Sequence, residues 1–255
     1  MTKTHLVIPD PHSHPDFNND RFDWLSRLIR DISPDVVINL GDHFDMPSLS
    51  GYDKGTKGFE GRRLRKDLDH GIEANDRIWS PIKRLKKKMP RRVVLEGNHE
   101  QRLRRVINSS PEFEGTLSFS MYEFNNYYGD VVEYNGQTPG VIGIDGVYYA
   151  HYFISGVMGR PVGGRHPCHA VLQEHYRSCV FGHIHTTDFA VRTDVSGSKI
   201  MSVCAGVFQD YDSGWAGECN KLWWRGIVVL RNVDNGSFDP QWISIDALRK
   251  EYGKP

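Results

Sequence analysis

The stretch Val36-Val-Ile-Asn-Leu-Gly-Asp-His-Phe-Asp45 joins a short apolar run to a turn of chemically active side chains. The apolar run is typical of a buried strand, and the glycine after it is typical of a turn. The same order recurs twice: Leu6-Val-Ile-Pro leads to Asp10-Pro-His12, and Val93-Val-Leu-Glu leads to Gly97-Asn-His-Glu100. Because ligands of open α/β sheets bind outside the carboxyl ends of the strands, we expect the three polar turns to converge.

Helical periodicity separates these three strands. From about residue 20 the chain has the spacing of an amphipathic helix, whose apolar face consists of Phe22, Leu25, Leu28, Ile29 and Ile32. Residues 61–88 form a second, longer amphipathic stretch, in which Gly71 and Pro81 should weaken or kink the helix. Strands that alternate with helices predict βαβ units and a largely parallel sheet.

The second half of the chain has short strand candidates separated by turns, at residues 141–144, 147–150, 179–181, 189–192, 199–204, 227–230 and 242–245. Asp145-Gly146 favours a two-residue hairpin, and Ser196-Gly197 and Asn235-Gly236 mark further turns. This half should be mostly antiparallel. With neither an internal repeat nor a low-complexity linker, we expect residues 1–255 to form one α/β domain of two β-sheets with helices packed outside.

The composition is that of an ordinary globular protein, with 38% hydrophobic and 25% charged residues, which excludes disordered and fibrous classes. No apolar stretch is long enough for a signal peptide or a membrane span, so we expect a cytoplasmic protein without a membrane partner. Cys168, Cys179, Cys204 and Cys219 lie far apart without a Cys-x-x-Cys pair. They should be reduced and structural, and not part of a disulfide framework or a thiolate zinc site.

The net charge is zero, yet residues 53–106 hold 17 Lys and Arg against 8 Asp and Glu. This basic segment contains the runs Arg62-Arg63-Leu-Arg65-Lys66, Lys86-Lys-Lys88 and Arg91-Arg92, and it continues to Arg102, Arg104 and Arg105. Such a segment can form an anion-binding face. It can equally be a solvated helix surface with salt bridges to Asp67, Asp69, Glu73 and Asp76, and both interpretations stay open here.

Two further clusters follow strands of the second half. His151 follows the hairpin strand, and Gly182-His183-Ile-His185 follows Val180-Phe181. Each cluster alone has a structural explanation, such as a turn or a buried histidine. Together, several buried carboxylates and imidazoles would be costly without a counter-charge, because desolvation and like charges penalise every ionised group. Two divalent cations would remove that cost.

As a set, the clusters resemble the signature blocks of the calcineurin-like metallophosphoesterases over roughly residues 5–205. The matching blocks are Asp10-x-His12, Gly41-Asp42-x-x-Asp45, Gly97-Asn98-His99-Glu100, His151 and Gly182-His183-x-His185. The resemblance implies a four-layer α/β/β/α sandwich of two mixed β-sheets flanked by helices. It also implies a phosphoester hydrolase with a dinuclear metal centre.

Residue roles follow from the same resemblance, position by position. One metal would be held by Asp10, His12 and His185, and the other by Asn98, His151 and His183, while Asp42 bridges the two. His99 would be the general acid that protonates the leaving group, and Asp45 would orient its imidazole. The remaining histidines, His14 and His43 among them, have no matching role and should be surface or packing residues.

The ligand chemistry bears on the identity of the metal. Oxygen and imidazole ligands without thiolate suit Mn²⁺, Fe²⁺, Zn²⁺ or Ni²⁺, and of these we expect Mn²⁺. Two cations about 3.5–4 Å apart acidify a shared water, so that a bridging hydroxide attacks the phosphorus, and they neutralise the charge of an in-line displacement. No nucleophile from the protein is then needed.

The substrate is less constrained, since relatives act on phosphoproteins, nucleotides and nucleic acids. Met46 stands where the protein phosphatase branch has arginine, whereas Glu100 is typical of that branch. The basic segment favours a phosphodiesterase or nuclease acting on DNA, RNA or nucleotides, with Arg62, Arg102 and Arg105 binding phosphate. The alternatives are a protein Ser/Thr phosphatase or a nucleotide phosphatase and, from another class, a non-catalytic scaffold.

Several aromatic residues and one loop have either a structural or a substrate-binding role. Apolar packing is the favoured role for the aromatic residues between positions 113 and 128, with base stacking as the alternative. Trp215, Trp223 and Trp224 should belong to the core or an interface, away from the site. The glycine-rich loop after His151 either closes over substrate or only connects two elements.

Overall fold

The computed structural model describes residues 2–52, 54–85 and 88–253. Its first sheet contains β1 (Lys3–Ile8), β2 (Val36–Asn39), β3 (Arg91–Leu95), β4 (Asp130–Val132), β12 (Gly226–Asp234) and β13 (Ser237–Ser244). The strand order is β13-β12-β1-β2-β3-β4, in which β1 to β4 are parallel and β12 and β13 are antiparallel to their neighbours. The predicted βαβ units therefore form the centre of this sheet.

The second sheet has the order β10-β11-β9-β6-β5. Its strands are β5 (Val141–Ile144), β6 (Val147–Ala150), β9 (Ser178–Phe181), β10 (Thr187–Thr193) and β11 (Lys199–Ala205). Strand β9 pairs in parallel with β6 and β11, while the β5–β6 and β10–β11 ladders are antiparallel. Both sheets are thus mixed.

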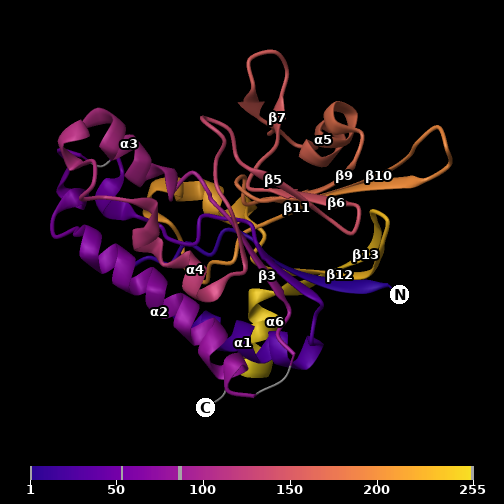
Figure 1. Ribbon diagram of the computed structural model, residues 1–255, viewed down its shortest axis with the longest axis horizontal. Helices are drawn as coiled ribbons and strands as arrows, with labels where there is room; N and C mark the ends of the chain where they lie inside the picture. Colours follow the sequence, from indigo (N-terminus) through magenta and orange to yellow (C-terminus); the bar gives the residue numbers. More distant parts are fainter. Residues whose placement is uncertain (1, 53, 86–87, 254–255) are drawn as a thin grey trace.

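Helices cover the two outer faces, which gives four layers (Figure 1). The helices α1 (Asp20–Ile32), α2 (Leu64–Lys83) and α6 (Ile245–Tyr252) lie on the side of the first sheet, and α5 (Pro167–His175) lies on the second. The short elements are α3 (Gln101–Ser109), α4 (Phe124–Tyr127), the hairpin β7 (Ile154–Ser155) and β8 (Arg160–Pro161), and the 3-10 helices η1 (Pro47–Leu49), η2 (Lys57–Phe59), η3 (Pro111–Phe113), η4 (Phe119–Tyr122) and η5 (Gly214–Leu222). The predicted four-layer α/β/β/α fold class is confirmed.

Two cores follow from the alternation of side chains along the strands. In β1, Leu6 and Ile8 pack in the cluster that contains the apolar faces of α1 and α2, whereas Val7 belongs to the cluster between the sheets. In β3, Val94 and Leu95 divide in the same way. A strand buried on both faces needs no polar positions, which explains why these runs are continuously apolar.

Helix α2 spans Leu64–Lys83, so it is shorter than the amphipathic stretch predicted for residues 61–88. It continues through Gly71, where a Cβ atom would lie 2.1 Å from the ring of Phe44, so the absent side chain makes room for that ring. Pro81 lies in the last turn of the helix. Lys86 and Lys87, which belong to the predicted Lys86-Lys-Lys88 run, lie outside the described residues.

Burial confirms the predicted packing role of four aromatic residues. Tyr122, Phe124, Tyr127 and Tyr128 are buried in the helix-side core, so base stacking by these rings is excluded. All four cysteines are free, and three of them are buried. Within the described ranges no helix has the length and apolarity to cross a membrane.

Candidate metal centre and active site

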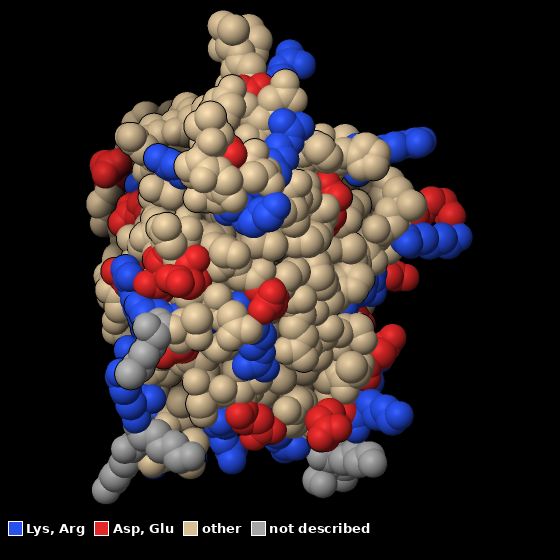
Figure 2. Space-filling view, turned by 90° about the vertical axis from the view of Figure 1, so that its right-hand side faces the viewer, with Lys and Arg blue, Asp and Glu red and all other residues tan. Residues whose placement is uncertain are grey.

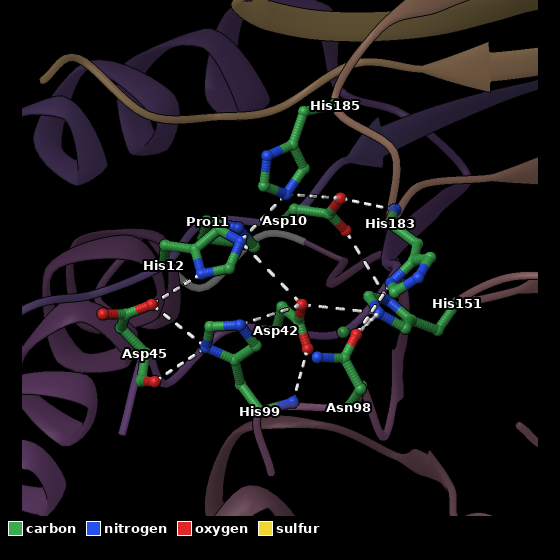
Figure 3. Close-up of polar contacts among 12 residues, drawn as sticks. Asp10, Pro11, His12, Asp42, Asp45, Asn98, His99, His151, His183 and His185 are labelled. Carbon is green, nitrogen blue, oxygen red and sulfur yellow. Dashed lines mark hydrogen bonds and ion pairs between the residues drawn. The ribbon is translucent and has the colours of Figure 1, made fainter. Parts of the chain in front are cut away.

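The polar turns of both sheets meet at one end of the sandwich. The register pairs Ile8 with Asn39, and Asn39 with Val94, so β1, β2 and β3 end side by side. In the second sheet Ala150 pairs with Phe181, so β6 and β9 also end together. The residues that follow these strands converge as the sequence predicted (Figure 3).

One group of donor atoms gathers around His12 and His185. Their Nε2 atoms lie 3.1 Å apart, and Oδ2 of Asp10 is 3.5 Å from Nε2 of His185. Oδ2 of Asp42 is 3.8 Å from Nε2 of His12. Two imidazole nitrogens and two carboxylates thus form a continuous series of contacts between 3.1 and 3.8 Å.

A second group gathers around Asn98. Its Oδ1 atom is 2.9 Å from Nε2 of His151 and 2.7 Å from Nδ1 of His183. Oδ2 of Asp42 lies 3.4 Å from Nε2 of His151, so the same carboxylate oxygen faces both groups. Figure 3 shows Asp42 between the two groups, with His12 and His185 on one side and His151 and His183 on the other.

The two groups fit divalent cations. Oδ1 of Asp10 is buried and receives no hydrogen bond from a described residue, and burial raises the pKa of Asp10 to about 8. Burial also lowers the pKa of His12, of His185 and of His183, the last to about 4, which favours the neutral imidazole that binds metal ions. Buried oxygen and nitrogen lone pairs without a donor are what a cation satisfies.

The backbone at this centre is unusual. Six non-glycine residues have left-handed φ angles, namely Asp10 (38°), His12 (43°), Asp42 (51°), Met46 (52°), His183 (72°) and His185 (60°). Such conformations cost of order 1 kcal/mol or more each, and they persist only where surrounding contacts impose them. Five of the six are predicted ligands, so the strain is concentrated where the donor atoms are aimed.

Glu100 supplies part of that constraint, a role that the motif alone does not reveal. Its carboxylate accepts hydrogen bonds from the backbone N–H groups of Asp42 (3.0 Å), Phe44 (2.9 Å) and Gly97 (2.9 Å). Burial, followed by the nearby charge of Asp42, raises the pKa of Glu100 to about 7. Glu100 therefore ties the turn after β2 to the turn after β3.

Glycine 182 allows the close approach of Asp10, and its replacement gives a testable result. A Cβ atom at position 182 would lie 2.4 Å from Oδ1 of Asp10. We expect Gly182→Ala to displace that carboxylate and weaken metal affinity by about 10–100-fold, as loss of a supporting contact does. Titration of the metal-free protein with Mn²⁺ measures this.

The matched control is Gly163→Ala, because a Cβ atom there meets nothing within 4 Å. This variant should bind metal like the wild type and melt at the same temperature. Equal metal affinity in both variants would show that the approach of Gly182 to Asp10 does not matter for the site.

His99 lies beside the two groups without joining either. Its Nδ1 atom is 2.7 Å from the carbonyl oxygen of Asp45 and 3.0 Å from Oδ1 of Asp45, while its Nε2 is 3.9 Å from Oδ2 of Asp42. Burial acts to lower the pKa of His99, but the charge of Asp42, together with the hydrogen bond and charge of Asp45, raises it. Because Nδ1 faces Asp45, Nε2 is the ring nitrogen on the side of Asp42.

Asp45 contacts two histidines. Its Oδ1 also accepts a hydrogen bond from Nδ1 of His12 at 2.9 Å. Burial would raise the pKa of Asp45, yet the hydrogen bonds from His12 and His99 hold it well below its usual range. Asp45, His12 and His99 bring their donor atoms within 4.8 Å of one another, and these hydrogen bonds account for that grouping without an ion.

The three predicted phosphate-binding arginines separate in space. Arg62 and Arg102 line a pocket of about 360 Å³ together with His99, which we call the catalytic pocket. Arg105 lines an adjoining hollow instead, and Arg102 lines both. Arg102 donates to the carbonyl oxygens of Asp45 (2.7 Å) and Met46 (3.2 Å), and its Nη2 is 3.1 Å from Nε2 of His99.

Some cations of the basic segment are neutralised by ion pairs within the fold. Arg65 pairs with Asp69, and Arg77 pairs with Glu73, Asp20 and Asp23. Arg104 pairs with Glu96 and Glu133. The salt-bridge interpretation is thus correct for Asp69 and Glu73, whereas Asp67 accepts a hydrogen bond from the backbone N–H of Ser48 and Asp76 accepts one from the hydroxyl of Tyr127. Arg62, Arg102 and Arg105 line the pockets.

One side of the catalytic pocket is formed by residues without a motif in the sequence. His14, Tyr211 and Trp215 line it, and Trp223 packs edge-on against His185 with ring centroids 4.4 Å apart. The prediction that Trp215 and Trp223 lie away from the site is wrong, because the chain after β11 returns to it. Their segment has no strand-end pattern that would reveal this.

His14 and His43 have different surroundings. Nε2 of His14 lies 3.6 Å from Oδ2 of Asp45 in the catalytic pocket, so it is more than a surface residue. His43 is a packing residue as predicted, since it is buried and hydrogen-bonds to Asn39 and the carbonyl of Gly71.

The glycine-rich loop after His151 forms the β7–β8 hairpin, which projects from the sandwich in Figure 1.

Comparison with known proteins agrees with the architecture. The family model of the calcineurin-like phosphoesterases matches residues 4–226. The Gene 54 protein of Mycobacterium phage L5 is 29% identical over 152 residues, which are 57% of each chain, so the match spans little more than half the length of that relative.

Two solved structures cover 96% of this chain and 100% of their own. One has a TM-score of 0.41 and 13% identity, and the other, TT1561 of Thermus thermophilus, has a TM-score of 0.36 and 10% identity. The family model includes all five strand-end clusters and most of the chain. The chain therefore belongs to the calcineurin-like phosphoesterase family, whose members hydrolyse phosphoesters with divalent metal ions.

Proposed function

We propose that this protein is a dinuclear metal-dependent phosphodiesterase that cleaves nucleic acid or nucleotides. The observation that carries the proposal is the pair of donor groups that share Asp42, with His99 beside them at the mouth of an arginine-lined pocket. A scaffold without activity would not require a protonatable imidazole at that position.

The proposed ligands divide as the geometry suggests. Asp10, His12 and His185 would hold one cation, and Asn98, His151 and His183 the other, with Asp42 between them. We propose Mn²⁺, in keeping with a donor set of oxygen and imidazole without thiolate. When bound, the two cations supply acidified water and neutralise charge on the phosphoryl group.

The side chains around the phosphate then have separate tasks. His99 is held at Nδ1 by Asp45; once Arg102 has turned to the phosphate, Nε2 can take up a proton from solvent and donate it to the leaving oxygen. Arg62 and Arg102 bind phosphate oxygens. When a phosphate oxygen accepts the hydrogen bond from Nη2 of Arg102, Nε2 of His99 no longer accepts it. This nitrogen is then free to face the leaving group.

Met46 bears on the alternative of a protein phosphatase. Its side chain is buried, so position 46 offers no group to substrate, and the cation beside His99 comes from Arg102 on α3 instead. The phosphate-binding arrangement therefore differs from that of the protein phosphatase branch at this point.

A substrate panel tests the proposed function. With Mn²⁺ restored after chelation, we expect wild-type protein to hydrolyse a nitrophenyl phosphodiester and labelled oligonucleotides faster than a nitrophenyl phosphomonoester. Elemental analysis of the same preparation should give two metal ions per chain. A strong preference for the monoester would favour a phosphatase, and inactivity on every substrate would favour the scaffold.

A further inference from the structure

A second hollow adjoins the catalytic pocket. It has a volume of about 450 Å³ and is lined by Tyr52, Lys54, Arg102 and Arg105 among others. Arg102 belongs to both cavities, and Ser50 of the catalytic pocket directly precedes Gly51 of the second hollow. Each cavity has the size of a small-ligand site, so together they offer room for more than one such unit.

The second hollow is cationic. Its described lining contains three cations, Lys54, Arg102 and Arg105, and no carboxylate. Neither Lys54 nor Arg105 makes an ion pair with a described residue. Arg104, one position before Arg105 on α3, shows the contrast, since Glu96 and Glu133 neutralise it. A cationic surface left without acidic partners suits a second phosphate group.

Each cavity also has an exposed aromatic ring. Trp215 is 72% exposed at the catalytic pocket, where it contacts Trp223 with ring centroids 5.6 Å apart. Tyr52 is 95% exposed at the second hollow. Exposed rings beside cations are the combination that binds single-stranded nucleic acid, because bases stack on the rings while phosphates contact the cations.

The face of the molecule drawn in Figure 2 has no broad cationic area. On the face shown in Figure 2, Lys and Arg side chains are interspersed with Asp and Glu, and no broad area of one sign is seen. On α2, the exposed Arg65 is paired with Asp69. The described lining of the second hollow, by contrast, holds cations without a carboxylate.

We infer that the substrate is a single-stranded nucleic acid longer than one nucleotide, with a neighbouring phosphate bound in the second hollow. The scissile phosphate lies at His99, the next phosphate contacts Lys54 and Arg105, and Trp215 and Tyr52 stack on bases. This inference rests on the proposed function, since it extends the same site. A duplex would hide the base faces that the two rings need.

Binding measurements test the inference without turnover. In a His99→Ala background with Mn²⁺ bound, fluorescence anisotropy would follow labelled thymidine oligonucleotides of one, four and eight nucleotides. Affinity should rise at least about tenfold from one nucleotide to four, and single strands should bind more tightly than a duplex of the same length. Adding Lys54→Gln and Arg105→Gln should weaken binding of the eight-nucleotide strand about tenfold and flatten the slope of log affinity against log salt by about 1.4, since each contact contributes about 0.7.

The matched control is the pair Arg231→Gln and Lys250→Gln, which removes the same charge at positions away from both cavities. It should leave affinity and salt slope unchanged. Trp215→Ala should weaken binding of the four-nucleotide strand by about tenfold, as loss of one stacked base does.

Equal affinity for one and eight nucleotides, or an unchanged salt slope in the Lys54→Gln and Arg105→Gln variant, would overturn the role of the second hollow. A duplex that binds as tightly as the single strand would overturn the choice of strand. Wild-type hydrolysis of the small phosphodiester is measured separately. If that reporter is cleaved while the length dependence is absent, the inference fails and the proposed function stands; if it is not cleaved, the proposed function itself fails.

Discussion

Replacing His99 with alanine should lower kcat/KM for an oligonucleotide by about 10²–10⁴-fold, the range typical of a lost general acid. His99 touches neither donor group as a ligand, and Asp45 holds its Nδ1 atom, so the variant should keep both metal ions. A nitrophenyl ester has a leaving group that needs little protonation. Its hydrolysis should therefore fall much less than that of the oligonucleotide.

The comparison of the two substrates, with metal content measured on the same samples, decides the role of His99. His169→Ala is a suitable control, because His169 is exposed on α5 and contacts Arg192. That variant should match the wild type on both substrates. Equal losses on both substrates in His99→Ala, or loss of a metal ion, would argue against proton donation by this residue.

Replacing Asp42 with asparagine should lower kcat by roughly 10³-fold or more, because its carboxylate serves both donor groups and two cations supply several kcal/mol of charge stabilisation. In the wild type, Oδ1 of Asp42 accepts a hydrogen bond from the backbone N–H of His99 at 2.8 Å. The amide oxygen of asparagine can accept the same hydrogen bond. The change thus removes charge with little change of shape. Burial acts to lower the pKa of His151, but the charge and hydrogen bond of Asp42, with the charges of Asp10 and Glu100, raise it to about 9, so the change at Asp42 also affects this imidazole.

Elemental analysis and Mn²⁺ titration should show fewer than two metal ions per chain in Asp42→Asn, together with weaker affinity. The control is Asp239→Asn, which changes an exposed carboxylate that accepts a hydrogen bond from the side chain of Asn232 on β12. This control should retain two ions and full activity. Two tightly bound ions and normal turnover in Asp42→Asn would contradict the shared carboxylate.

The histidines and carboxylates at the strand ends were predictable because the signals are local. An apolar run followed by glycine and a polar pair marks where a parallel strand ends, and parallel strands end at one edge. Asp10, Asp42, Asn98, His151 and His183 were placed in this way without knowledge of the sheet order. The geometry of β1, β2, β3, β6 and β9 then brings them together.

The tasks of several buried groups could not be predicted in the same way. Glu100 is part of a visible motif, yet its three backbone hydrogen bonds depend on how the turns after β2 and β3 are stacked. Asp45 was predicted to orient His99, but its second partner, His12, comes from a different strand end. Hydrogen-bond partners far apart in the chain depend on packing and not on spacing.

The sequence by itself determined the strand ends, their reactive side chains and the layered α/β class, because these depend on the periodicity of residues close together in the chain. Only the tertiary structure decided that β12 and β13 join the first sheet and that Trp215 and Trp223 return to the metal centre. It alone also decided which cations of the basic segment are neutralised and which, like Arg102, face the pocket. The physical reason is that sheet-edge pairing and helix orientation are set by burial of apolar surface over the whole chain, which no local pattern records.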